Sequence, residues 1–146
     1  MDLAPTHLHP AAARSLAAWH AMVAKADLSE LARIVHPDAV FRSPMAFNPY
    51  GPAPALLLAL QTVVTILKDF RYHRQFASDD GLNVVLEFSA RVGDKQLKGV
   101  DLIRFNEQGQ ITDFEVMIRP LNGLQALGAE MGVRLGQHLP GFKRKG

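Results

Sequence analysis

Apolar and polar residues alternate along two runs that meet at a glycine-containing turn between Gly99 and Pro120. Such alternation places successive side chains on opposite faces of a strand, so the segment predicts a β-hairpin. The positions that share one face in each arm are Asp101, Ile103 and Phe105, and then Phe114, Val116 and Ile118. A carboxylate among apolar neighbours is costly unless it is paired, hydrogen-bonded or protonated, so Asp101 is the first candidate for chemistry.

The remaining pattern predicts four helices and three further strands. Apolar residues at helical spacing predict helices over 10–26, 27–35, 53–68 and 121–135. Alternation predicts strands over 39–43, 70–77 and 82–92. The helix over 53–68 has the widest apolar stripe, so we expect it to pack on a sheet. The proline-rich segment 44–54 is expected to be a rigid loop that either frames an opening or only connects its neighbours.

Two local signals refine these elements. Asp27 and Glu30 have the spacing of a capping box, which predicts where the second helix starts, and the His-Pro-Asp sequence at 36–38 ends that helix. In the strand over 70–77, the alternation groups four residues on one face, namely Phe70, Tyr72, Arg74 and Phe76.

The order of the elements predicts an α+β fold, because helices and a short strand come first and four meandering strands and a last helix follow. We expect a cone-shaped, curved antiparallel (mixed) sheet wrapped around the long helix, with helices at the N-terminal and C-terminal ends. The C-terminal helix either caps the mouth of the cone or extends a dimer. The uncovered sheet face predicts a homodimer, and we interpret Glu115 and Arg119 as a salt bridge at its seam.

The chain has 146 residues, 48% of them hydrophobic, and no cysteine, which excludes disulfides and thiolate chemistry. This size suits a single domain over 1–146, with a loose N-terminal arm over 1–9 and a basic tail over 141–146. Without the three basic residues at 143–145, the formal net charge changes from +2 to −1, so no nucleic-acid partner is expected. The lack of a long apolar run and of a signal-like N-terminus predicts a cytoplasmic protein that does not bind a membrane.

The segment Asp101–Ile111 has the sequence Asp-Leu-Ile-Arg-Phe-Asn-Glu-Gln-Gly-Gln-Ile. It is similar to the strand, turn and strand in which steroid isomerases carry an Asp before Arg-Phe-Asn and a Gly turn. Weaker matches lie at 25–28 and 36–44. On these motifs, residues 12–119 resemble the nuclear transport factor 2-like superfamily, in its polyketide-cyclase-like (SnoaL-like) and ketosteroid-isomerase-like branch. The resemblance implies the fold but no single reaction, because this fold carries isomerases, cyclases, dehydratases, epoxide hydrolases and non-catalytic modules.

The resemblance also implies positions for three functional groups. Asp101 falls where the isomerases hold the protonated Asp of their oxyanion hole, as is known for ketosteroid isomerase. Trp19 falls where they have the oxyanion Tyr, and its N–H can donate one hydrogen bond. Ser43 falls where they have the Asp that moves the proton, and a serine without an activating partner is no base near neutral pH. Isomerisation of ketosteroids by the mechanism of that family is therefore not expected.

The pocket is expected to be apolar with one acid, which suits a small hydrophobic molecule with a carbonyl or hydroxyl group. Its candidate lining residues are Trp19, Phe41, Ser43, Phe70, Tyr72, Glu87, Asp101, Phe114, Val116 and Ile118. Glu87 belongs to this set only if the odd-numbered residues of its strand face inward, and the apolar residues at even-numbered positions argue against that. Possible bases are His20, His36 and His73.

Two functions remain open. In the first, Asp101 is a general acid or hydrogen-bond donor in an isomerase, cyclase or dehydratase-like enzyme that uses no cofactor. In the second, the chain is a ligand-binding or dimerisation module that has lost the general base, and the Asp101 carboxyl is satisfied by a neighbouring Trp, Tyr or Arg. No metal site is expected, because the sequence contains no ligand cluster. An epoxide hydrolase would need an Arg beside the acid, and Arg104 is predicted to face away from Asp101.

Overall fold

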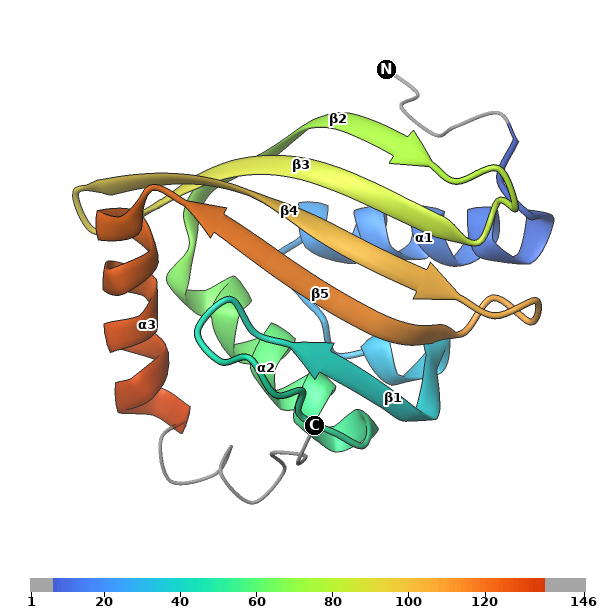
Figure 1. The fold of residues 1–146 in the computed structure, drawn as a ribbon, viewed down its shortest axis with the longest axis horizontal. Helices are drawn as coiled ribbons and strands as arrows, with labels where there is room; N and C mark the ends of the chain where they lie inside the picture. Colours follow the sequence, from blue (N-terminus) through green and yellow to red (C-terminus); the bar gives the residue numbers. More distant parts are fainter. Residues whose placement is uncertain (1–6, 136–146) are drawn as a thin grey trace.

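The computed structural model describes residues 7–135, which form one curved five-stranded sheet and its helices (Figure 1). The elements in chain order are α1 (Pro10–Ala24), the 3-10 helix η1 (Leu31–Ile34), β1 (Val35–Arg42), α2 (Ala53–Ile66), β2 (Lys68–Ala77), β3 (Asn83–Val92), β4 (Lys95–Phe105), β5 (Ile111–Arg119) and α3 (Leu121–Leu135). The strand order is β1-β5-β4-β3-β2, in which β1 is parallel to β5 and the other neighbours are antiparallel. The predicted α+β fold with a mixed, curved sheet is confirmed.

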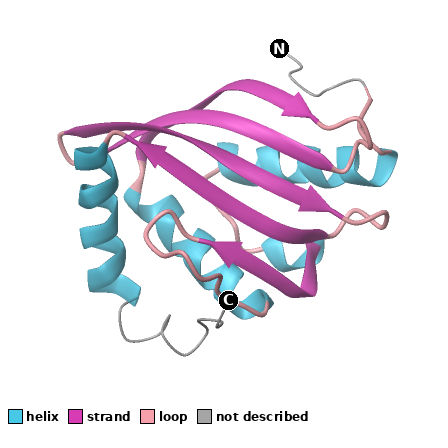
Figure 2. Ribbon diagram, in the orientation of Figure 1, coloured by secondary structure: helices cyan, strands magenta, loops and turns pink. Residues whose placement is uncertain are grey.

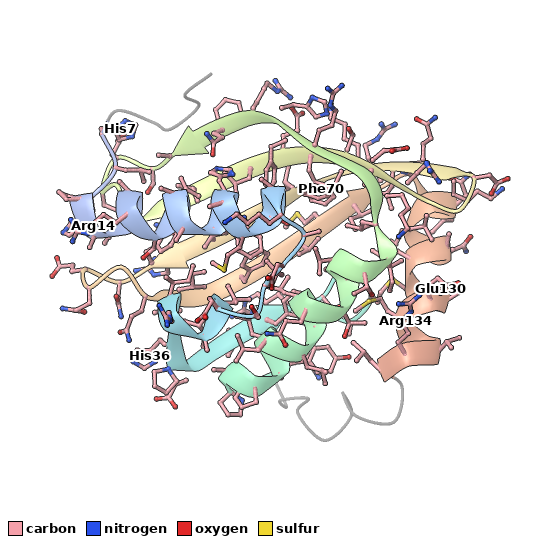
Figure 3. All side chains as sticks on the ribbon, turned by 180° about the vertical axis from the view of Figure 1, so that it is seen from behind. His7, Arg14, His36, Phe70, Glu130 and Arg134 are labelled. Atoms are coloured by element: carbon pink, nitrogen blue, oxygen red, sulfur yellow. The ribbon has the colours of Figure 1, made fainter. Side chains whose placement is uncertain are left out.

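The helices gather on one side of the sheet. In Figure 1, α1 and α2 lie behind the strands, and α3 stands at the end of the sheet where β3 turns into β4; Figure 2 shows the same arrangement by element type. Figure 3, viewed from behind, shows α1 and α2 in front of the strands. The core between these layers joins Leu16 of α1, Leu56 of α2 and Phe114 of β5, each at most 1% exposed. Burial of each such side chain contributes about 2 kcal/mol to stability.

Helix α1 begins at the predicted proline, but the residues just before it are not loose. His9 Nδ1 accepts a hydrogen bond from the N–H of Ala11 at 3.2 Å and so caps the helix. Leu8 belongs to the core, and His7 Nε2 lies 3.1 Å from the carbonyl oxygen of Ser78. Residues 7–9 therefore form part of the folded body, contrary to the predicted loose arm over 1–9. Residues 1–6 of that arm and the predicted basic tail over 141–146 lie outside the described residues.

The predicted second helix is reduced to one 3-10 turn, η1. Asp27 Oδ1 accepts a hydrogen bond from the N–H of Ser29 at 3.0 Å, and Glu30 pairs with Arg33 at 2.7 Å, so no capping box forms. Strand β1 follows directly and is longer than the predicted strand over 39–43. Pro37 cannot donate to a neighbouring strand, and it lies where the register between β1 and β5 shifts.

A β-bulge changes the faces of β2. The pairs that reveal it are Tyr72 with Phe88 and Gln75 with Leu86, so three steps along β2 match two along β3. Both residues of the bulge, His73 and Arg74, reach the outer face of the sheet, away from the helices, where they bond to side chains of β3. Phe76 also leaves the face of Tyr72 and is 52% exposed. The predicted grouping of Arg74 and Phe76 with Tyr72 is therefore wrong.

The central hairpin forms as the alternation predicts. In β4 and β5, Asp101 is opposite Val116 and Ile103 is opposite Phe114. Asp101 is 5% exposed and lies on the same side of the sheet as the helices. Among residues 7–135, no helix combines the length and apolar character needed to cross a membrane.

Candidate functional site

The inner face of the sheet and the helices enclose a cavity of about 340 Å³. Nine of the ten residues predicted to line a pocket surround it: Trp19, Phe41, Ser43, Phe70, Tyr72, Asp101, Phe114, Val116 and Ile118. They come from α1, from β1 and the residue that follows it, and from β2, β4 and β5. The wall is apolar except for a few hydroxyl groups and the Asp101 carboxyl. A cavity of this character suits a small hydrophobic molecule with one polar group.

Three side chains of the cavity wall are joined by hydrogen bonds. The indole N–H of Trp19 donates to the hydroxyl oxygen of Tyr72 at 3.0 Å, and this hydroxyl donates to Oδ2 of Asp101 at 2.6 Å. The three residues come from α1, β2 and β4, so the fold brings them together from distant parts of the sequence. The indole can only donate and an ionised carboxylate can only accept, so the bonds run in one direction and end on Asp101.

Burial raises the pKa of the Asp101 carboxyl to about 7, because an apolar environment disfavours the charged form, and the hydrogen bond from Tyr72 opposes this shift. Burial also raises the pKa of Tyr72 well above its ordinary value, and the charge of Asp101 and the hydrogen bond to it act in the same direction. Near pH 7, Asp101 therefore populates both protonation states while Tyr72 stays a neutral donor. Such a carboxyl can both give and take a proton.

Aromatic rings hold Tyr72 in place. The centroid of the Tyr72 ring lies 4.9 Å from that of Phe70 and 5.2 Å from that of His20, and both contacts are edge-to-face. Phe70 in turn stacks on Phe88 with 5.1 Å between centroids. Each pair of this kind stabilises the fold by about 1 kcal/mol beyond the burial of its area. The hydroxyl of Tyr72 is thus fixed at Asp101 by packing as well as by its hydrogen bonds.

The three histidines considered as bases lie away from the cavity wall. His20 Nε2 is 2.6 Å from the amide oxygen of Gln75, His36 Nδ1 accepts from a backbone N–H two residues on, and His73 Nε2 is 2.7 Å from the hydroxyl of Ser89. Within residues 7–135, Asp101 is therefore the one carboxyl or imidazole group that lines the cavity. In the same part of the chain, no three His, Cys, Asp or Glu side chains gather to hold a metal ion.

Glu87 does not line the cavity, contrary to the prediction. The even-numbered residues of β3 are buried against the helices, so the odd-numbered ones face outward. There, Glu87 accepts two hydrogen bonds from Arg74, at 2.7 and 2.6 Å, and pairs with Lys98 at 3.1 Å. These partners, Arg74 first, lower the pKa of Glu87 to about 2. Glu87 is thus an ionised group of the outer sheet face.

Ser43 lines the cavity at the end of β1. Its Oγ accepts a hydrogen bond from the N–H of Met45 at 3.0 Å, which leaves its own hydrogen to donate. This geometry gives Ser43 no base to activate it. Arg104 is exposed and lies on the opposite face of β4 from Asp101, so the Arg-bridged acid that an epoxide hydrolase needs does not form at Asp101.

Helix α3 forms one wall of the cavity. Its cavity-lining residues, which the sequence analysis missed, are Leu127, Gly128, Met131, Gly132 and Leu135. The signal that could have found them is glycine spacing, because residues 128 and 132 lie one helical turn apart on one face. Met45 and Tyr50, from the loop between β1 and α2, were also missed as lining residues.

Residues 16–114 match the family model of the SnoaL-like domain. No protein of curated function matches the sequence. A crystal structure described as a steroid delta-isomerase from Pseudomonas aeruginosa is 60% identical to this chain, covers 91% of it and 97% of its own length, and superposes with a TM-score of 0.87.

Two further solved structures are similar in fold. An uncharacterised protein with a cystatin-like fold from Silicibacter pomeroyi is 32% identical over 91% of this chain and 90% of its own, with a TM-score of 0.80. SalBIII, an epoxide hydrolase/cyclase-like enzyme of pyran ring formation in the polyether salinomycin, is 16% identical over 75% of this chain and 91% of its own, with a TM-score of 0.61. This chain therefore belongs to the SnoaL-like family, within the nuclear transport factor 2-like superfamily.

Proposed function

We propose that this protein is a cytoplasmic, cofactor-independent isomerase that acts on a small hydrophobic carbonyl compound, with Asp101 as the group that moves the proton. The observation that carries the proposal is the hydrogen-bonded series from Trp19 through Tyr72 to Asp101 on the wall of an apolar cavity. The relative with 60% identity is described as a steroid delta-isomerase, which supports an isomerase over other activities of this fold. Cyclase or dehydratase chemistry on a hydroxyl compound would use the same acid.

In the proposed reaction, Asp101 acts first as a base and then as an acid. Its carboxylate takes a proton from the carbon next to the substrate carbonyl, and the electron pair of the broken C–H bond forms an enolate. The protonated Asp101 then returns the proton to another carbon of the conjugated system. No electron is gained or lost overall, so no cofactor is required. A pKa of about 7 keeps both forms of Asp101 available near neutral pH.

The side chains around Asp101 have separate parts in this proposal. Tyr72 stabilises the carboxylate form through its hydrogen bond, and Trp19 orients the Tyr72 hydroxyl. The hydroxyl of Ser43 is the donor we assign to the enolate oxygen, because it lines the cavity and its Oγ is held by a backbone N–H. A donor aimed at developing charge in a dry site lowers the barrier more than the same donor in water.

The alternative is a non-catalytic module that binds a hydrophobic ligand. The observation that favours it is Ser43, which stands where the resembling isomerases have their proton-moving Asp. In that case the bond from Tyr72 only satisfies a buried carboxyl.

Deuterium exchange separates the two functions. A β,γ-unsaturated ketone is incubated with the protein in deuterium oxide, and NMR follows both exchange next to the carbonyl and formation of the conjugated isomer. We expect Asp101→Asn to lower the exchange rate by at least about 100-fold. Glu87→Gln is the matched control, since it neutralises the buried carboxylate of the outer face. An unchanged rate in Asp101→Asn, or binding without exchange in the wild type, would reject the isomerase and leave the binding module.

We also propose that the protein forms a homodimer through the outer face of the sheet. No helix of residues 7–135 covers this face, and Met117 on it is 50% exposed. Glu115 and Arg119 project from the same side of β5 and are candidates for ion pairs across the seam. Light scattering at micromolar concentration tests the proposal, and a single species at monomer mass would remove it.

A further inference from the structure

The strand that carries Tyr72 is the one whose place in the sheet is least constrained by its neighbours. Within residues 7–135, β2 is an edge strand and pairs with β3 alone (Figure 1). Its register with β3 also shifts between Tyr72 and Gln75, where the bulge lies. A bulge disrupts the hydrogen bonds between strands locally, because its extra residue stays unpaired. The position of the Tyr72 hydroxyl therefore depends on contacts from other elements as well.

Helix α1 makes such contacts on both sides of the bulge. The indole N–H of Trp19 donates to the hydroxyl of Tyr72 at 3.0 Å, and Nε2 of His20, the next residue, lies 2.6 Å from the amide oxygen of Gln75. Since this oxygen can only accept, the imidazole nitrogen is the donor. The partners of Tyr72 and Gln75 in β3 are both buried on the inner face, so the bulge brings these two residues to one face. Two adjacent residues of α1 thus hold β2 before and after the bulge.

The imidazole of His20 contacts Tyr72 as well as Gln75. Its centroid lies 5.2 Å from that of the Tyr72 ring, and the two rings meet edge-to-face at 86°. A movement of β2 against α1 at Gln75 would therefore disturb the packing of the Tyr72 ring as well.

The place of His20 outside the cavity limits what it can do. It does not line the cavity, whereas Tyr72 and Asp101 do, so it can influence a bound molecule only through its neighbours. Among the described residues on the cavity wall, Asp101 is the one carboxyl, imidazole or cationic side chain. A displacement of the Tyr72 hydroxyl must therefore show in the titration of Asp101.

We infer that His20 is a positioning residue, whose hydrogen bond to Gln75 fixes β2 at the bulge and so keeps the Tyr72 hydroxyl on Asp101. The inference rests on the proposed function, in which Asp101 moves the proton, and it adds a residue outside the cavity to the parts of the site. The two hydrogen bonds from α1 then act together: Trp19 orients the Tyr72 hydroxyl, and His20 fixes the strand that carries it.

Carbon-13 NMR of the Asp101 carboxyl tests the inference without substrate. The full chain is labelled at the carboxyl carbons of its aspartates, and Asp101→Asn assigns the signal. His20→Phe keeps a ring against Tyr72 but removes the donor to Gln75. Because the hydrogen bond from Tyr72 lowers the pKa of Asp101, displacement of the hydroxyl should raise the titration midpoint by at least about half a pH unit.

Three further variants separate the hydrogen bond from other effects of the imidazole. Gln75→Leu removes the same bond and keeps the imidazole, so it should raise the midpoint as His20→Phe does; an effect of imidazole charge would leave it at the wild-type value. His20→Gln offers an amide N–H of similar reach and should restore the wild-type midpoint. His36→Phe is the matched control, because His36 lies on β1 and bonds to the backbone N–H of Asp38.

A double variant shows whether His20 acts through Tyr72. Tyr72→Phe already removes the bond to Asp101, so His20→Phe should add no further rise in that background. An equal further rise there would overturn the inference, as would a wild-type midpoint in His20→Phe or in Gln75→Leu, and Gln75→Leu decides if His20→Phe does not fold. Shifted midpoints in a protein that exchanges no proton on ketones would reject the proposed isomerase and keep His20 as the residue that positions Tyr72.

Discussion

Tyr72 of β2 donates a hydrogen bond of 2.6 Å to Asp101 of β4, across the intervening strand β3. Tyr72 pairs with the inward-facing Phe88 and lies before the bulge in β2, so it takes the inner face, while the next two residues turn outward. The pKa of Asp101 depends on this contact, because burial raises that pKa and the hydrogen bond from Tyr72 lowers it.

Tyr72→Phe removes the bond to Asp101 and the acceptor of Trp19 while it keeps the ring. Because the bond lowers the pKa of Asp101, we expect that pKa to rise above about 7 in the variant. The pH at which deuterium exchange is half-maximal then rises as well. The indole N–H of Trp19 loses its acceptor, so the free energy of unfolding falls by about 1–3 kcal/mol. Tyr50→Phe, at the other cavity-lining tyrosine, should keep the wild-type midpoint of the pH profile. If Tyr72→Phe also kept the wild-type midpoint, the role of Tyr72 in lowering the pKa of Asp101 would be contradicted.

Asp101 also makes stability depend on pH. Its pKa rises from an ordinary value of 3.8 to about 7 on folding, so between these values the folded chain holds a proton that the unfolded chain releases. The free energy of unfolding must therefore fall as pH rises through this window, by up to about 4 kcal/mol in all. Asp101→Asn cannot titrate and should lose this slope. Urea unfolding of both proteins at about pH 5 and about pH 8 measures it, and equal slopes would refute the assignment.

The sequence was sufficient for the central hairpin and for nine of the cavity residues, because alternation places Asp101 and its apolar neighbours on one face of a paired strand. It was not sufficient for β2, where one bulge reverses the face of Phe76. Glu87 was placed in the pocket although its apolar neighbours in β3 predicted the opposite face. The lining by α3 was missed, because the helix over 121–135 was predicted from its apolar positions alone, and Gly128 and Gly132 are not among them. Bulges and contacts between distant elements depend on tertiary packing, which local periodicity does not encode.

Glu87→Gln tests the outer face separately from the cavity. Hydrogen bonds from Arg74 lower the pKa of Glu87 from 4.5 to about 2, so its stabilisation is complete above about pH 4.5 and is lost as pH falls through about 2. The variant should be less stable than the wild type at neutral pH, and the difference should vanish in acid. Exchange on a ketone should stay within about twofold, because Glu87 lies outside the cavity. A difference in stability that persists below pH 2 would point to packing instead of charge.

Gly128 and Gly132 give a matched pair on the cavity face of α3. A methyl group added at Gly132 would meet nothing within 4 Å, whereas one at Gly128 would meet the end of the Met45 side chain. Replacing glycine with alanine inside a helix contributes up to about 1 kcal/mol through propensity alone. We therefore expect Gly132→Ala to raise the free energy of unfolding by up to that amount, and Gly128→Ala to gain less or to lose stability, because Met45 must leave its position.

A double-mutant cycle separates this displacement from the helix effect. Met45→Ala removes the atoms that the new methyl would meet, so the Gly128→Ala change should become favourable in the Met45→Ala background, with a coupling of about 1 kcal/mol in urea unfolding. Equal gains for the two glycine variants in the wild-type background would show that Met45 does not pack on α3.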